Sequence, residues 1–181
     1  MNKRCYVALV RGINVGRAKR IAMADLRALV ESLGYSGVRS LLNSGNVVFQ
    51  AAGTTAPAAA AAIEEALVLK LGVAARVFVL EHGELAAVIA ANPLLGVALD
   101  HSRLIVFFLG EAAQRAQLAA LDGQDWGCER LALGERAAYV WCPEGMLDSA
   151  PAKALGKLLG DGTTSRNWST LMKLHALCSE G

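Results

Sequence analysis

Hydrophobic positions in the first half of the chain alternate between short β-forming runs and repeats with helical spacing. Residues 5–11 are apolar up to Arg11 and predict a mostly buried strand, whereas residues 23–33 place apolar side chains on one helical face. Gly34 follows that helix, where glycine commonly ends a helix. The patterns predict, in chain order, a strand at 5–11, a helix at 23–33, strands at 38–42 and 46–51, a helix ending near residue 71, and a strand at 75–80.

This order is β-α-β-β-α-β, the ferredoxin-like arrangement, in which two helices cover one face of a four-stranded antiparallel sheet. A helix at 83–91 follows, and Asn92-Pro93 is a natural break, so we expect domains at residues 1–92 and 93–181. The second half begins in the same way, with a strand at 103–109, a helix at 111–121 and strands at 129–133 and 137–142. It then continues in helices at 152–159 and 167–178, without a closing strand. We therefore expect an α+β protein with duplicated ferredoxin-like halves, the second copy ending in helices.

Composition supports a packed core and adds an uneven distribution of charge. Of the 181 residues, 54% are hydrophobic and 19% charged, which excludes a disordered chain. The net charge of +2 is too small to indicate nucleic-acid binding. However, the first 20 residues hold six basic side chains, and the first acidic residue is Asp25. This basic end is the candidate anion-binding end; the alternative is a solvated surface with uneven charge.

The cysteines and the apolar runs indicate the compartment. Cys5, Cys128, Cys142 and Cys178 form no CxxC pair, and Cys5 and Cys142 lie in apolar runs, where a free thiol behaves as a small hydrophobic group. We therefore expect buried structural cysteines in a reducing compartment. The first apolar run is too short for a signal peptide, and none reaches the ~18 residues of a membrane span. These features predict a cytoplasmic protein without a membrane partner.

The segment at residues 11–20, RGINVGRAKR, is the strongest candidate for a binding site. Glycines let the backbone turn several N–H groups toward one point, and basic side chains around such a concavity favour an anion. The segment leads into a helix, whose N-terminus is the positive end of the helix dipole. It matches neither Walker A nor GxGxxG. The alternative is a tight strand-to-helix turn with solvated bases. The candidate ligand-binding residues here are Arg11, Gly12, Asn14, Gly16, Lys19 and Arg20.

Two polar segments add to this candidate site. Ser44-Gly45-Asn46 joins two predicted strands, and a plain hairpin turn is the favoured explanation, although Ser44 and Asn46 can also reach a polar ligand. Before the last helix, Asn167 or Ser165 can serve as the cap. Capping does not account for Arg166, which can join an anion site at the entrance of the helix. We therefore include Ser44, Asn46, Arg166 and Asn167 among the candidate ligand-binding residues.

Signals for catalysis, metals and RNA are weak. The histidines at 82, 101 and 175 lack a paired ligand spacing, so we expect no metal, and we expect no cofactor. Neither GxSxG nor SxxK occurs, no catalytic residue is nominated, and the question of enzymatic activity stays open. The predicted sheet offers only Tyr6 and Phe49 for base stacking, which disfavours the RNA-recognition type of surface.

Three segments together resemble a known family. YVALVRGINVG at residues 6–16, NSGNVVF at 43–49 and TSRNW at 164–168 are similar to the signatures of the bacterial family "domain of unknown function 1697", and the resemblance spans essentially the whole chain. It implies a small bacterial cytosolic protein with duplicated ferredoxin-like halves, without an assigned activity or catalytic residues. The family typically has a second glycine after Gly16, where this chain has Arg17, which weakens any hypothesis that requires a flexible glycine pair.

The sequence therefore favours an uncharacterised protein that binds a small phosphorylated or otherwise anionic ligand at the basic, glycine-containing loop. The alternative is a nucleic-acid-binding or protein-interaction module without catalysis. A nucleic-acid partner predicts affinity that falls steeply with salt. The oligomeric state is not indicated by the sequence.

Overall fold

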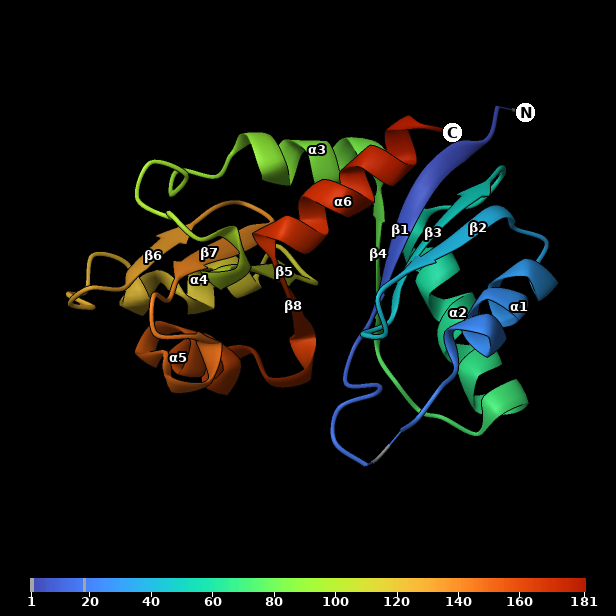
Figure 1. The fold of residues 1–181 in the computed structure, drawn as a ribbon, viewed down its shortest axis with the longest axis horizontal. Helices are drawn as coiled ribbons and strands as arrows, with labels where there is room; N and C mark the ends of the chain where they lie inside the picture. The colour runs from blue at the N-terminus through green and yellow to red at the C-terminus, as the bar shows by residue number, and fades with distance from the viewer. Residues whose placement is uncertain (1, 18) are drawn as a thin grey trace. The chain divides into compact units, whose positions relative to one another are not determined.

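The structure is a computed structural model that describes residues 2–17 and 19–181. The chain forms two compact units: one holds the residues up to Ala86 together with Lys173–Gly181, and the other holds Ala87–Met172. The divisions fall inside two helices, α3 (His82–Ala90) and α6 (Trp168–Ser179) (Figure 1). The sequence-based boundary at residues 92–93 lies just after α3, and the pattern of the sequence did not indicate that residues 173–181 group with the first unit.

The first unit contains a four-stranded antiparallel sheet with two helices on one face (Figure 1). The strand order is β2-β3-β1-β4, and β1 pairs with β3 on one side and β4 on the other. The elements are β1 (Arg4–Val10), α1 (Met23–Ser32), β2 (Ser36–Leu41), β3 (Asn46–Ala51), α2 (Ala56–Leu71) and β4 (Val77–Glu81).

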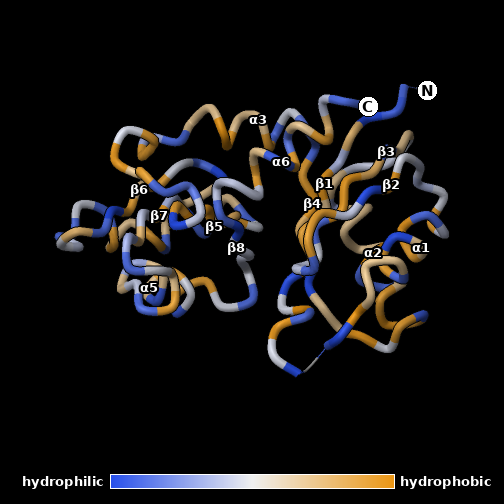
Figure 2. The backbone as a smooth tube through the Cα atoms, in the orientation of Figure 1, coloured by the Kyte–Doolittle hydropathy of each residue, from blue (hydrophilic) through white to orange (hydrophobic). Residues whose placement is uncertain are grey.

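The core of the first unit explains the continuous apolar run of β1. Alternate residues Tyr6, Ala8 and Val10 belong to the core formed with α1 and α2, as expected from the two-residue repeat of a strand. Val7 and Leu9 point to the other face and are also fully buried. A strand buried on both faces has no polar alternation, and β1 is accordingly among the most hydrophobic segments in Figure 2.

The second unit repeats the order of elements around its own sheet. The strand order is β6-β7-β5-β8, again antiparallel, and alternate residues of β5 pack on α5 in a separate core. The elements are β5 (Leu104–Leu109), α4 (Gln114–Gln117), β6 (Arg130–Leu133), β7 (Ala137–Trp141), α5 (Ala150–Leu159) and β8 (Thr163–Asn167). The two sheets are consistent with two ferredoxin-like halves.

Two expectations for the second unit are wrong. The second sheet does have a closing strand, because β8 pairs with β5 from Ile105–Asn167 to Leu109–Thr163. The sequence TTSRN is polar, which is compatible with a strand at the edge of a sheet. The hydroxyl of Thr163 is buried with a hydrogen-bond partner, since its Oγ1 donates to the carbonyl of Phe108 over 2.7 Å. The helix expected at 111–121 is also shorter, and is replaced after α4 by a 3₁₀ turn at Ala119–Leu121.

Within the part of the chain that the structure describes, no helix combines the length and the apolar character needed to cross a membrane.

Candidate functional site

The basic loop after β1 is folded back on itself by its own backbone. The N–H of Asn14 donates to the carbonyl of Lys19 over 3.1 Å, and both residues have positive φ, 55° and 51°. Gly12 and Gly16 also have positive φ, 70° and 63°. Asparagine and glycine tolerate this left-handed conformation well, so the glycine pattern that the sequence singled out serves the shape of the loop directly.

Asn14 is the residue that fixes this loop. Its side-chain Nδ2 donates to the carbonyls of Ile21 (2.9 Å) and Asn43 (2.8 Å), and its Oδ1 accepts from the N–H of Ile21 (2.8 Å). Both amide hydrogens are therefore used within the protein. Asn14 connects the loop to the β2–β3 turn through these hydrogen bonds. Its contribution to a ligand site is to position the neighbouring loop residues.

The Ser44-Gly45-Asn46 turn supports the same loop. Asn46 is fully buried, and its Nδ2 donates to Ser44 Oγ over 2.9 Å, while the N–H of Val10 donates to the carbonyl of Gly45 over 2.8 Å. Gly45 has φ 85°, and a Cβ there would lie 2.9 Å from atoms of both Ile13 and Val10. The close approach and the positive φ together require glycine at this position.

An open hollow of about 310 Å³ lies where the loop enters α1. The residue that caps α1 is Ala22, which has no side-chain acceptor for the N–H groups of the first turn. Arg20 is exposed and lines the hollow, which Ala22 and Met23 at the start of the ten-residue α1 also line, so a basic residue and the positive end of a helix border one hollow. Asp25 is the acidic residue of that first turn, and its negative charge disfavours the binding of an anion. The hollow is lined by Asn14, Arg20, Ile21, Ala22, Met23 and Asn43.

Arg166 and Asn167 belong to β8 in the second unit, whereas the other candidate residues belong to the first. Asn167 Oδ1 accepts from the N–H of Thr170 over 2.9 Å, so Asn167, one of the two candidates that the sequence offered, caps the helix. Arg166 is half-buried and donates to Thr164 Oγ1 (2.9 Å) and to the Ser165 carbonyl (2.8 Å). Burial lowers the pKa of its guanidinium to about 10. Both residues thus have structural contacts within their own unit.

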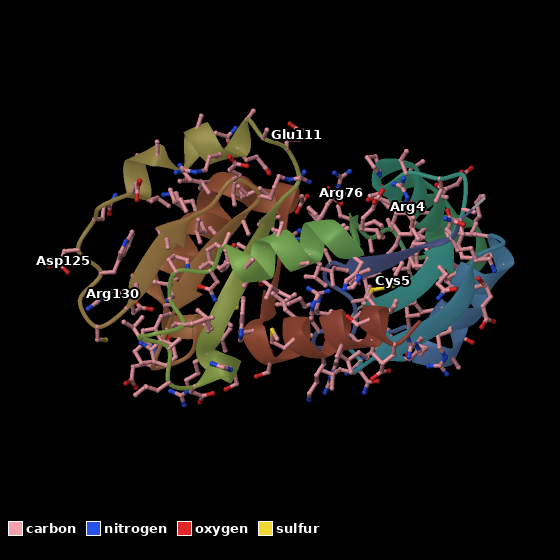
Figure 3. All side chains as sticks on the ribbon, turned by 90° about the horizontal axis from the view of Figure 1, so that it is seen from above. Arg4, Cys5, Arg76, Glu111, Asp125 and Arg130 are labelled. Atoms are coloured by element: carbon pink, nitrogen blue, oxygen red, sulfur yellow. A yellow bond between two sulfur atoms is a disulfide. The ribbon has the colours of Figure 1, made fainter. Side chains whose placement is uncertain are left out.

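The expectation of buried cysteines in the reduced state is wrong for three of the four, because Cys128 is exposed and Cys5 and Cys178 are bridged. Cys5 of β1 and Cys178 of α6 form a disulfide within the first unit, with their Cα atoms 5.8 Å apart (Figure 3). Cys128 and Cys142 are free, and burial raises the pKa of the Cys142 thiol to about 11. The bridge joins residues 173 positions apart, so no local spacing in the sequence could have indicated it.

The same part of the first unit contains a pair of histidines that the sequence did not connect. His82 Nε2 lies 3.0 Å from His175 Nδ1, and the hydroxyl of Ser179 lies 3.4 Å from the same His82 nitrogen. Burial, and secondarily the neighbouring His175, lower the pKa of His82. Among the described residues no group of three or more histidine, cysteine or acidic side chains is placed to hold a metal ion.

The histidine pair predicts that the first unit loses stability in acid. The pKa of His82 is lower in the folded chain than its ordinary value of about 6.5, so the unfolded chain binds the proton more readily. The free energy of unfolding should therefore fall as the pH decreases from 7 through that value toward 5. Urea denaturation at both pH values should show a smaller decrease for His82→Gln than for the native protein. An equal decrease in both would contradict the assignment.

Comparison with known proteins identifies the family. A family model described as "Protein of unknown function (DUF1697)" matches residues 3–139. The chain belongs to this family. The match contains the motifs at 6–16 and 43–49, whereas the third motif of the DUF1697 resemblance, at 164–168, lies beyond the matched residues.

A solved structure extends the likeness of this DUF1697 protein over the whole chain. It is that of the conserved bacterial protein SP0830 from Streptococcus pneumoniae, which is 25% identical with a TM-score of 0.79. The alignment covers 98% of this chain and 99% of that one, so it includes β8 and α6. No curated protein is significantly similar to the chain.

Proposed function

We propose that this DUF1697 protein binds a small phosphorylated or otherwise anionic ligand at the basic loop of its first unit. The observation that carries the proposal is the hollow at the start of α1, where Arg20 stands beside a helix N-terminus without a side-chain cap. Backbone N–H groups and a guanidinium are the donors that phosphate and carboxylate groups prefer.

The described residues around the hollow support this function because hydrogen bonds within the protein already hold them in place. Asn14 fixes the loop through three hydrogen bonds, and Gly45 allows the neighbouring turn to pack against Ile13. A preformed site loses less conformational entropy on binding. Exposed Lys19 adds positive charge on the same loop, whereas Arg166 and Asn167 are not required.

The energetic contributions indicate which residue to test. A helix N-terminus contributes about 0.3–1 kcal/mol toward an exposed anion, whereas a charge-assisted hydrogen bond contributes about 1.5–3 kcal/mol. Arg20 should therefore carry more of the affinity than the helix. Removing its side chain should weaken binding roughly tenfold or more, since 1.4 kcal/mol corresponds to a factor of ten.

A thermal-shift panel tests this prediction. It contains inorganic phosphate, nucleotides, sugar phosphates and a short RNA, each at two salt concentrations. A ligand at a hundred times its dissociation constant should stabilise the native protein by ~2.7 kcal/mol, or roughly 5–10 °C for a chain of this length. We expect the shift to be largely lost in Arg20→Ala.

The matched control is Arg115→Ala, which removes the same side chain from α4 of the second unit. It should respond to the ligand as the native protein does. Equal shifts in all three proteins would contradict a site at the loop. A shift with RNA alone, lost at the higher salt concentration, would instead support the nucleic-acid-binding alternative.

A further inference from the structure

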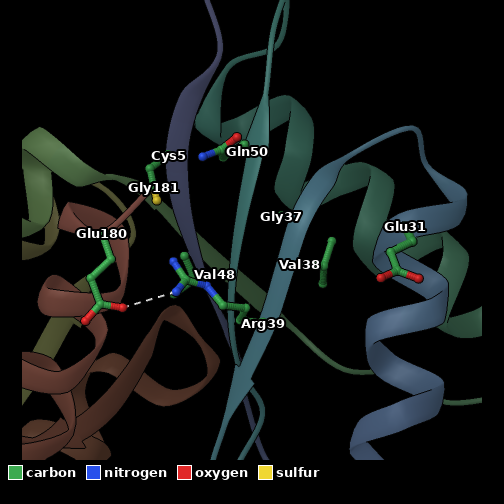
Figure 4. Close-up of a pocket in the computed structure, with 9 residues that line it drawn as sticks. All are labelled: Cys5, Glu31, Gly37, Val38, Arg39, Val48, Gln50, Glu180 and Gly181. Atoms are coloured by element: carbon green, nitrogen blue, oxygen red, sulfur yellow. Dashed lines mark hydrogen bonds and ion pairs between the residues drawn. The ribbon is translucent and has the colours of Figure 1, made fainter.

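A groove of about 470 Å³ runs along the first sheet beside the disulfide (Figure 4). Cys5 lines this groove, whereas its partner Cys178 is only 5% exposed and is not among the lining residues. Of the two bridged cysteines, Cys5 therefore borders the groove and Cys178 is enclosed by the protein. The volume falls within the ~300–1,000 Å³ that small-molecule sites occupy. The remaining lining residues are Glu31, Gly37, Val38, Arg39, Val48, Gln50, Glu180 and Gly181.

Two noncovalent links join the end of α6 to the rest of the first unit near the disulfide. The guanidinium of Arg39 donates to the carbonyl of Leu177 and forms an ion pair with Glu180, with 3.3 Å between Nη1 and Oε2. The second link is the 3.0 Å contact between His82 and His175. The end of α6 thus keeps polar attachments that do not depend on the S–S bond.

The histidine link lies close to both ends of the bridge. His175 precedes Cys178 by three residues on α6, and residues at this spacing are neighbours on a helix surface. In the antiparallel pairing of β1 with β4, Tyr6 lies opposite Glu81. Cys5 precedes Tyr6 and His82 follows Glu81, so both lie next to this pair at the same end of the two strands. The disulfide and the imidazole pair therefore connect the same two parts of the unit.

We propose that Cys5–Cys178 is a thiol–disulfide exchange centre, reached by a small-molecule thiol through the groove. This activity is separate from anion binding at the basic loop, which lies around a different hollow of the same unit. The class of ligand follows from the site: a disulfide reacts with a thiolate, and only a small one fits a groove of this volume.

The exchange balances without any further reactant. The thiolate sulfur of the small molecule attacks Cys5 Sγ and forms a new S–S bond with it. The Cys5–Cys178 bond breaks, its electron pair leaves with Cys178 Sγ, and the proton lost by the incoming thiol returns to Cys178 through solvent. The incoming thiol is oxidised to a mixed disulfide, and Cys178 is reduced. A second thiol molecule can then release Cys5 as a free thiol and leave as its own disulfide.

The two noncovalent links keep the unit folded after the exchange. With the bridge open, the Arg39 contacts and the histidine pair still hold the end of α6, so the two cysteines stay near each other. The bridge forms again when the Cys178 thiolate attacks Cys5 Sγ of the mixed disulfide and the small thiol leaves with the electron pair of the broken bond. Glu180 and Gly181, which form one wall of the groove, lose their covalent restraint near residue 178.

The test maps which cysteine receives the thiol in the folded protein. The oxidised protein is incubated with 2-mercaptoethanol, quenched with an alkylating reagent and analysed by peptide mass spectrometry. We expect the mercaptoethanol adduct on Cys5 and the alkyl group on Cys178, with circular dichroism unchanged. A thiol-terminated polyethylene glycol, too large for the groove, should react at a much lower rate.

Two controls keep the result interpretable. In urea-denatured protein both cysteines should carry the adduct, because the groove no longer distinguishes them, and Cys128→Ser should react as the native protein does. Equal labelling of Cys5 and Cys178 in the folded protein would overturn the proposal. An exchange rate that equals the rate of global unfolding would overturn it as well. Loss of the anion-induced thermal shift in Arg20→Ala would change neither the labelling pattern of the cysteines nor the exchange rate. The failure of one proposal can therefore be distinguished from the failure of the other.

Discussion

Replacing Cys178 with serine is expected to lower the free energy of unfolding of the oxidised protein by about 2–5 kcal/mol. The bridge joins residues 173 positions apart and so closes nearly the whole chain into one loop, which greatly restricts the unfolded ensemble. For a chain of this length the melting temperature should fall by roughly 5–20 °C. Urea denaturation of the variant and of the native protein measures the difference.

The matched control for this prediction is Cys128→Ser, which removes an exposed cysteine that is not part of a disulfide. We expect that variant to change stability by less than about 0.5 kcal/mol. Reduced native protein should unfold like Cys178→Ser, since both lack the bridge. Equal stability of Cys178→Ser and the oxidised native protein would show that the bridge does not form in solution.

Replacing Phe49 with alanine is expected to cost about 3–5 kcal/mol of stability. Phe49 is fully buried on β3, between the rings of Tyr6 (5.5 Å between ring centres) and Tyr35 (4.7 Å), both stacked on it. Truncation removes the buried ring and both stacking contacts and leaves a cavity in the core of the first unit. The free energy of unfolding from urea denaturation measures the loss.

The aromatic cluster has a suitable surface control in the same unit. Leu69 on α2 is 75% exposed, so Leu69→Ala should change stability by less than about 0.5 kcal/mol. A conservative Phe49→Leu variant should recover part of the loss, because it fills part of the space. A loss below about 1 kcal/mol for Phe49→Ala would contradict the packing of the three rings.

The basic loop shows how far residue types can predict a site. Glycine at 12 and 16 and asparagine at 14 indicated a loop of unusual backbone conformation, and all three have positive φ in the structure. The sequence could not show that Asn14 uses both its amide hydrogens within the protein, because one of its acceptors, the Asn43 carbonyl, is distant in the chain. That ligands bind at this loop stays a prediction.

The second unit shows where hydrophobic patterns fail. The segment TTSRN has no apolar alternation, because β8 is an edge strand and pairs with one neighbour only. Its position in the sheet depends on backbone hydrogen bonds to β5, and those bonds carry no signature in side-chain hydrophobicity. A helix cap could be predicted from the same segment, since a cap acts over three residues, but the choice of Asn167 over Ser165 came from the structure.

Features that depend on near neighbours in the chain could be predicted from the sequence. These are the α+β class, the order of elements in the first unit, the glycine-dependent loop and the family resemblance, because strand alternation, helical periodicity and turn chemistry act over a few residues. The features that join distant segments were found only in the folded chain. They are the closing strand β8, the Cys5–Cys178 bridge, the His82–His175 pair and the groove beside Cys5. Each depends on side chains or strands that come into contact only when the chain has folded, and no local sequence pattern indicates which of them will do so.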